Sequence, residues 1–229
     1  MSISGNKRSV IGIVAAILAV IGLPVLVSAG SSGNSPTVCI ASGFWETGQN
    51  QDWDAGSKGW NQVRQVSTAQ GSWQVRAVWV KNDPQNWVET GWYITASGYT
   101  RYFIASSRFG IYDEQLLGYA PPATYHWFAV RNPTGNEWEF WLDNTQWLFT
   151  RDDMPFNVGR PGAQSEVHNS CDQAGTTFWY LQKYIRTYQG WYPWTSFAAN
   201  IDNPSNNPNY YIDRSGQWGA PDVLRISPY

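Results

Sequence analysis

The sequence predicts an all-β protein built as an antiparallel β-sandwich, and three observations lead to this fold class. Aromatic residues are abundant, with 15 Trp, 13 Tyr and 9 Phe, while only 14% of the residues are charged. Short segments alternate between apolar and polar residues with a period of two, and Gly, Asn, Asp and Pro separate them. No segment carries a sustained helical period. This combination is typical of a compact extracellular β protein.

The chain divides into an export segment and one domain. Its start is polar, with Lys7 and Arg8, and a long apolar run follows that ends in small residues up to Ala29. This pattern predicts a signal peptide over residues 1–29 and a single β-sandwich domain over residues 30–229. An uncleaved anchor is the alternative, because the apolar run is nearly long enough to span a bilayer. In both cases we expect a secreted or extracellular protein that meets a membrane only through this segment.

The net charge of the chain indicates which partners to expect, and its two cysteines indicate a cross-link. Without Lys7 and Arg8, 13 basic residues remain against 17 acidic ones, a formal charge of −4. Phosphate binding needs a basic face and none is visible, so nucleic acid is not an expected partner. Cys39 and Cys171, in an exported chain, predict one disulfide. Closing so long a loop would contribute roughly 4–5 kcal/mol in the chain-entropy model.

Short strands separated by turn signals follow from the alternation. The expected strands cover residues 37–45, 60–67, 72–82, 86–96, 100–108, 124–132, 136–144, 146–151, 162–169, 176–188 and 222–227. NPTGN at 132–136 and TASGY at 95–99 each predict a hairpin turn. The best helix candidate, Tyr180 to Tyr188, is rich in β-formers and is equally compatible with a strand. NIDNPSNNPN at 200–209 predicts a loop.

A carboxylate interrupts the strand WVETGWYI. Alternation places Glu89 on one face of this strand with Trp87 and Tyr93. A buried carboxylate needs a partner, because leaving water costs several kcal/mol unless the group is paired, hydrogen-bonded or protonated. In GAQSEVHN the same rule puts Glu166 on one face with Gln164 and His168. Both glutamates therefore lie on the more polar face of their strands, and both could lie on one outer surface of a sandwich.

Common catalytic signatures are absent, since there is no GxSxG, P-loop, GxGxxG or HExxH motif. With only His126 and His168, no metal site is expected, and DWDAG at 52–56 is better interpreted as a turn than as a calcium loop. No cofactor is implied. What remains is a pair of carboxylates, which can share a proton and activate water without a metal. The alternative is a non-catalytic role, in which each glutamate pairs with an arginine such as Arg76 or Arg101, or points into solvent.

VETGWYI, followed by GAQSEVHN and then AGTTF, resembles the neprosin family of secreted glutamic peptidases, which carry an E-x-G-W strand and a later G-G-E-V strand. It is more loosely similar to the fungal glutamic peptidases, or eqolisins. The resemblance covers roughly residues 72–178 and rests on two short motifs. Similar motif pairs also occur in uncharacterised secreted bacterial proteins, for which no activity follows. It implies a jelly-roll, concanavalin-like sandwich.

The same resemblance implies Glu89 and Glu166 as a catalytic dyad. The resulting hypothesis is an endopeptidase that acts at acid pH, in which Gln164 hydrogen-bonds the developing oxyanion. The chain departs from the family pattern at Gln164-Ser165, where the neprosin motif has two glycines, and this departure puts close approach of a substrate backbone in doubt. The plant-type prosegment is missing, and the cysteine set differs.

Three other functions stay open. A carbohydrate-binding, lectin-like module would use the Trp87 and Tyr93 face together with Trp191 and Trp194 of the loop GWYPWTSF. A glycosidase would use Glu89 and Glu166 as its two carboxylates. A non-catalytic cell-surface protein would use neither. The expected partner is therefore a polypeptide or a polysaccharide.

Overall fold

The structure is a computed structural model that describes residues 38–44, 54–65, 73–95, 97–168, 176–194, 198–202, 210–213 and 223–228. The expected signal peptide and Cys171 lie outside these ranges, and the side chain of Cys39 is not described. The signal peptide and the disulfide therefore stay predictions. Within the described ranges, no helix has the length and apolar character needed to cross a membrane.

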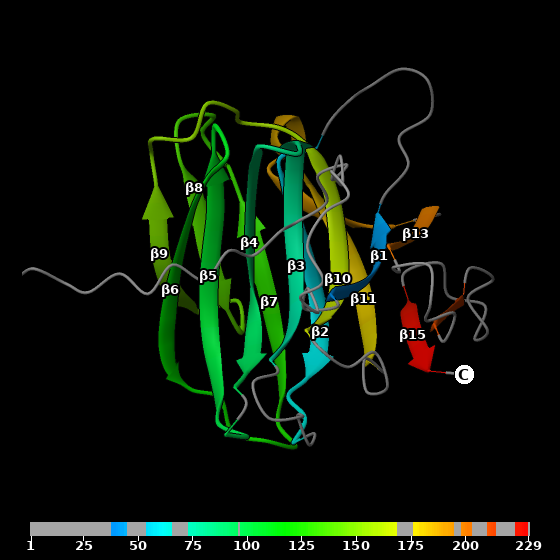
Figure 1. Ribbon diagram of the computed structural model, residues 1–229. Helices are drawn as coiled ribbons and strands as arrows, with labels where there is room; N and C mark the ends of the chain where they lie inside the picture. Colours follow the sequence, from blue (N-terminus) through cyan, green and yellow to red (C-terminus); the bar gives the residue numbers. More distant parts are fainter. Residues whose placement is uncertain are drawn as a thin grey trace, which may run out of the picture.

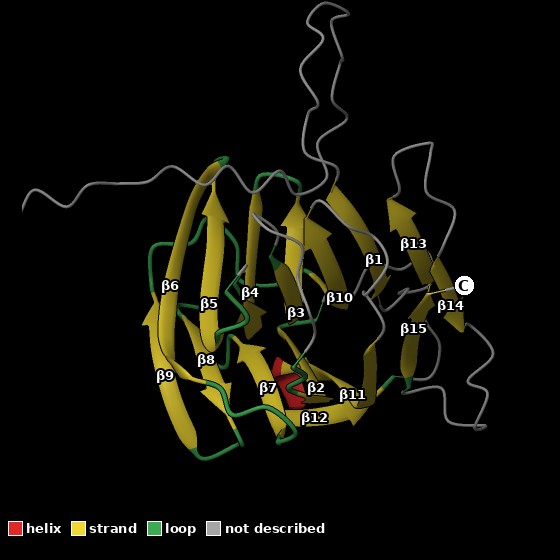
Figure 2. Cartoon of the chain, turned by 60° about the horizontal axis from the view of Figure 1, so that its bottom comes forward, coloured by secondary structure: helices red, strands yellow, loops and turns green. Residues whose placement is uncertain are grey.

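The chain folds into two antiparallel sheets, which Figure 2 shows as two stacked rows of strands. The strand order of the first sheet is β13-β1-β10-β3-β4-β5-β6, and that of the second is β14-β15-β11-β2-β7-β8-β9, with β12 pairing with β11. The bounds are β1 (Val38–Phe44), β2 (Gly56–Gln62), β3 (Gln74–Asp83), β4 (Asn86–Ile94), β5 (Thr100–Arg108), β6 (Ile111–Tyr119), β7 (Tyr125–Arg131), β8 (Trp138–Leu142), β9 (Gln146–Arg151), β10 (Arg160–His168), β11 (Thr176–Ile185), β12 (Gly190–Pro193), β13 (Ala198–Asp202), β14 (Tyr210–Asp213) and β15 (Leu224–Pro228). The predicted all-β antiparallel sandwich is confirmed.

The main core lies between the two sheets. Alternation sends Val78 and Trp92 of the first sheet inward, where they meet Phe128 and Phe178 of the second, and all four side chains are at most 1% exposed. The Trp92 indole is also satisfied, because its Nε1 donates to Oδ1 of Asn61 at 2.7 Å. Residues adjacent to these in each strand of the first sheet therefore face away from the second sheet. We call this side the outer face.

Long-range strand pairing brings the two predicted glutamate strands close together. β3 lies between β4 and β10, so strands more than seventy residues apart in the sequence flank one another across a single strand. Figure 1 shows β4, β3 and β10 in this order. Ser57 of β2 donates to the carbonyl oxygen of Gly162 at 2.9 Å, which ties β10 to the second sheet.

Several elements differ from the sequence expectation. The strand β6 was not predicted, because as an edge strand it exposes most of its side chains and lacks an apolar face. β2 begins at Gly56 rather than at residue 60. The helix candidate is a strand, β11, with an irregularity between Trp179 and Gln182 where Tyr180 has a φ of 55°. Only a 3₁₀ turn, Arg186–Tyr188, follows it. The end of β13 overlaps the start of the expected loop, and β14 begins directly after it.

Candidate functional site

Glu89 lies in the middle of β4 on the outer face of the first sheet. Its neighbours across the sheet are Trp79 of β3 and Ala105 of β5. The side chain is only 4% exposed. It points away from the main core because Val88, which precedes it, points into that core.

Glu166 lies on the same outer face, one strand beyond β3. It is opposite Val75, just as Gln164 of the same strand is opposite Ala77. Glu166 is 2% exposed. Gln164 links the two strands, because its Nε2 donates a hydrogen bond to Oε2 of Glu89 at 3.1 Å. The structure thus places Glu89, Gln164 and Glu166 on one face, as the sequence predicted, with Gln164 in contact with Glu89 and Glu166 near enough to act on Glu89 electrostatically.

Neither glutamate pairs with Arg76 or Arg101, the arginines named for a non-catalytic role. Among the described residues, no ion pair joins a cation to Glu89 or Glu166. The guanidinium of Arg76 lies on the core side, 5.6 Å from the centre of the Trp92 ring. Arg101 donates instead to the carbonyl oxygen of Leu117 at 2.9 Å. Oε1 of Glu166 is buried and accepts no hydrogen bond from the residues described.

Burial dominates the protonation of both acids. It raises the pKa of Glu89 well above its usual value, and the nearby Glu166 and Glu114 raise it further, while Lys81 lowers it. Burial likewise raises the pKa of Glu166 to about 8, with Glu114 adding to the rise and Lys81 opposing it. Because the two glutamates interact, they titrate as a pair. Such a pair holds one proton over a range of pH, with one group acid and the other base.

Two residues of β6 belong to this surface and were missed from the sequence. Tyr112 and Glu114 are opposite Ser107 and Ala105 of β5, which places them on the Glu89 face. The Tyr112 hydroxyl donates to Oε2 of Glu114. Partial burial raises the pKa of Glu114, and this hydrogen bond opposes the rise. Alternation in IYDEQLLGY would have paired them, had the segment been recognised as a strand.

Aromatic side chains surround the carboxylates. Trp87, 4% exposed, packs on Tyr112 with ring centres 5.8 Å apart. Tyr93 stacks with Trp73 at 6.2 Å. They join an apolar cluster on the outer face that includes Phe103. This lining explains why desolvation is the largest cause of the raised pKa values.

Three predicted binding residues do not join this group. The side chain of His168 lies outside the described residues, although its backbone ends β10. Trp194 is 0% exposed and packs in the main core, so the expectation that it offers a surface to sugar is wrong. Trp191 lies on β12, which belongs to the second sheet, where its ring packs on Tyr184 at 5.2 Å. It therefore does not form one platform with Trp87 of the first sheet.

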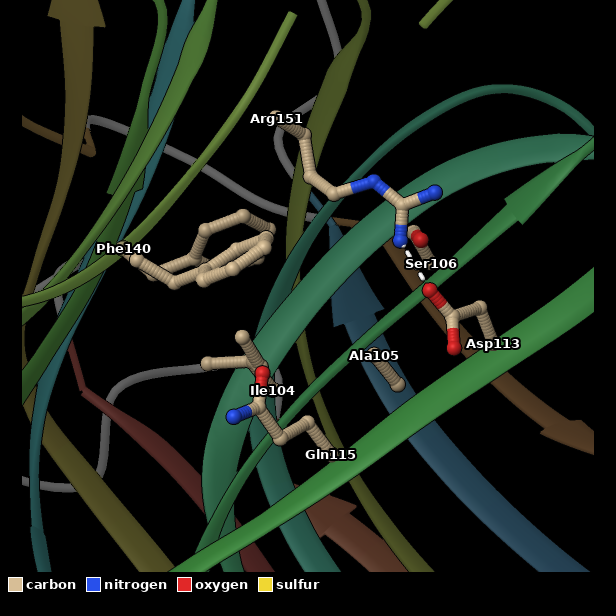
Figure 3. A pocket seen from close by; sticks show the side chains of 8 residues that line it. Ile104, Ala105, Ser106, Asp113, Gln115, Phe140 and Arg151 are labelled. Carbon is tan, nitrogen blue, oxygen red and sulfur yellow. Dashed lines mark hydrogen bonds and ion pairs between the residues drawn. The ribbon is translucent and has the colours of Figure 1, made fainter. Parts of the chain in front are cut away.

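A small pocket of about 50 Å³ lies on the other side of β5 and β6 (Figure 3). Ile104 and Phe140 line its apolar side, and Arg151 pairs with Asp113 at its opening. This ion pair joins β6 to β9, the edge strands of the two sheets. Asp113 is adjacent to Glu114 but points to the opposite face. The pocket is therefore separate from the glutamates. Within the part of the chain that the structure describes, no group of three or more His, Cys, Asp or Glu residues is arranged to hold a metal ion.

Known proteins resemble this chain in structure rather than in sequence. No family model matches it, and no curated protein sequence does. A crystal structure of Scytalido-glutamic peptidase with a peptide-based transition state analog aligns with a TM-score of 0.61 over 84% of this chain and 98% of that chain, at 9% identity. SCP-B, a member of the Eqolisin family of peptidases in complex with the tripeptide Ala-Ile-His, aligns over the same shares with a TM-score of 0.58 and 10% identity. At such identities the likeness establishes the sandwich fold.

Proposed function

We propose that this protein is a glutamic peptidase in which Glu89 and Glu166 hydrolyse peptide bonds through an activated water. The observation that carries the proposal is the pair itself. Two nearly fully buried carboxyl groups share one face, Gln164 donates a hydrogen bond to one of them, and an oxygen of the other has no partner in the described ranges. Burying two such groups costs stability, and proteins keep costs of this kind chiefly at functional sites. The fold of the solved glutamic peptidases supports the proposal.

The raised pKa values suggest a role for each acid. The carboxylates of Glu89 and Glu166 oppose each other's ionisation, and we assign Glu166 as the base because its Oε1 has no hydrogen-bond partner among the described residues. In the singly protonated pair, the free Oε1 of Glu166 accepts a proton from water as the water oxygen bonds to the scissile carbonyl carbon. Glu89 gives its proton to the carbonyl oxygen. When the C–N bond breaks, Glu166 returns its proton to the leaving amine and Glu89 recovers one from the new carboxyl group.

This assignment makes activity bell-shaped in pH. It falls at low pH as Glu166 becomes protonated and at high pH as Glu89 loses its proton. Because burial raises both pKa values, both limbs of the profile, and with them the active range, are displaced to higher pH than the acid range expected from the sequence.

Digestion of casein from pH 3 to pH 10 tests the proposal. We expect Glu89→Gln and Glu166→Gln each to lower kcat/KM by about 10²–10⁴-fold. Glu137→Gln, which removes a carboxylate beside β8 of the second sheet, serves as the matched control and keeps full activity. If kcat/KM has the same pH profile in the wild type and in the two dyad variants, the proposal is wrong.

A glycoside substrate is the second candidate, favoured by the aromatic lining of Trp87, Tyr93 and Tyr112 around the carboxylates. Such rings pack against the apolar faces of ligands. The same three variants assayed on a soluble β-glucan separate the candidates. Release of reducing sugar that depends on both glutamates, without casein cleavage, would assign a glycosidase instead.

A further inference from the structure

Trp79 presents a buried hydrogen-bond donor without an acceptor. It lies on β3 on the outer face, in register between Glu89 of β4 and Gly162 of β10. Its side chain is 7% exposed, and within the described part of the chain its Nε1 has no hydrogen-bond partner. An unpaired buried N–H is costly, so native structures keep few of them and each calls for a reason.

Gly162 fixes the position of this indole. A Cβ at residue 162 would lie 2.1 Å from Cζ2 and 2.2 Å from Cε2 of Trp79, so only glycine lets the ring lie against β10. Cε2 is bonded to Nε1, and the nitrogen side of the ring is thereby held beside the strand that carries Gln164 and Glu166. Lys81, whose Nζ is 5.5 Å from the centre of the ring, adds positive charge nearby.

The unpaired donor on Trp79 complements the unpaired acceptor on Glu166. Both are buried on the same face, and neither has a hydrogen-bond partner among the residues that the structure describes. A reacting peptide with its attacking water supplies both: a water proton for Oε1 of Glu166 and a carbonyl oxygen for Nε1 of Trp79. Donors prepared in advance at a dry site stabilise charge that develops in the transition state.

We propose that the indole N–H of Trp79 binds the substrate carbonyl oxygen and stabilises the negative charge that develops on it during peptide hydrolysis. This inference rests on the proposed function. The N–H bond stays intact throughout: Trp79 donates a hydrogen bond as the water oxygen joins the carbonyl carbon, and releases it when the C–N bond breaks. Gln164 keeps its hydrogen bond to Glu89.

Trp79→Phe tests the inference, because it removes the N–H and keeps an aromatic ring. We expect kcat/KM on a fluorogenic casein-derived peptide to fall about 10²–10³-fold, mainly through kcat. The variant should stay folded, because the cost of the smaller ring is partly offset by removal of an unsatisfied donor. Trp141→Phe is the matched control: it removes an N–H that donates to Glu139 on the second sheet and keeps activity. Full kcat in Trp79→Phe, with dyad-dependent activity in the wild type, would overturn the inference alone.

A second readout does not depend on turnover. In protein labelled with ¹⁵N at tryptophan, the Trp79 indole signal is assigned by its loss in Trp79→Phe. A peptidyl difluoroketone, whose hydrate imitates the tetrahedral intermediate, should shift this signal and slow its hydrogen exchange. Trp79→Phe should bind the difluoroketone about 10²-fold more weakly. Binding that leaves the signal unmoved would overturn the inference. Absence of both cleavage and binding in the wild type would overturn it together with the proposed function.

Discussion

Gln164 on β10 donates a hydrogen bond from Nε2 to Oε2 of Glu89 on β4, at 3.1 Å and across the strand that separates them. The amide therefore supports the charged form of Glu89 in a site where burial opposes that charge. Gln164 also fixes which oxygen of Glu89 faces β10. This contact makes the state of Glu89 sensitive to a residue on another strand.

Removing this amide should raise the pKa of Glu89 further. In Gln164→Ala we expect the alkaline limb of the pH–activity profile to move to higher pH, since the hydrogen bond that favours the carboxylate is lost. Activity at the optimum should fall as well, because Glu89 loses its fixed orientation. The pH dependence of kcat/KM on a peptide substrate measures both effects. Gln146→Ala, on exposed β9, is the control, and an unmoved alkaline limb in Gln164→Ala contradicts the expectation.

Glu114 should tune the dyad by its charge. Its carboxylate raises the pKa of Glu89 and that of Glu166, so Glu114→Gln should lower both values and move both limbs of the profile to lower pH. Asp113→Asn is a matched control, because Asp113 is adjacent in sequence but points to the opposite face and pairs with Arg151. A profile displaced equally by the two variants would point to a loss of structure in β6 rather than to charge.

The strand faces of the site could be predicted, and the strand neighbours could not. Period-two alternation is local. It correctly placed Glu89 on the polar face of its strand, and it correctly placed Gln164 and Glu166 together on the polar face of theirs. That β3 separates these strands depends on pairing between residues far apart in the chain, such as Trp79 with Gly162. Such register comes from tertiary packing, which a local pattern does not contain.

Two residues, Glu114 and Trp194, show which structural features a local sequence pattern does not contain. Glu114 escaped notice because β6 is an exposed edge strand with charged and polar residues, which resembles a loop in sequence. Trp194 was placed on the surface because the aromatic loop GWYPWTSF was interpreted as a platform for sugar rings. Its backbone N–H instead donates to the carbonyl oxygen of Leu181 at 2.9 Å, which turns the side chain into the core.

Stability should fall as pH rises through the titration of Glu166. Its folded pKa of about 8 is higher than that of an unfolded glutamate, so folding binds a proton and is favoured below the unfolded value. The contribution is fully present at low pH and is lost as pH approaches and passes the folded pKa. Its slope is at most about 1.4 kcal/mol per pH unit for one carboxyl group.

Glu166→Gln removes this titration while keeping the shape of the side chain. Guanidinium unfolding of both proteins at pH 4.5, 6 and 8 gives the free energy difference at each pH. We expect the wild type to lose stability relative to Glu166→Gln as pH rises through this window. A difference that is constant, or that grows in favour of the wild type, contradicts the raised pKa.

Gly91 should be indispensable to the sheet that carries the dyad. A Cβ at this position would lie 1.9 Å from the carbonyl oxygen of Arg76 on β3, a rigid backbone atom that cannot move aside. Gly91→Ala should therefore force β3 and β4 apart and lower the free energy of unfolding by about 2–4 kcal/mol. Gly118→Ala is the matched control, because a Cβ there meets no atom within 4 Å, and it should change stability by less than about 1 kcal/mol. Tryptophan fluorescence during guanidinium unfolding compares the two variants, and equal midpoints would contradict the close approach of β3 and β4 beside Glu89.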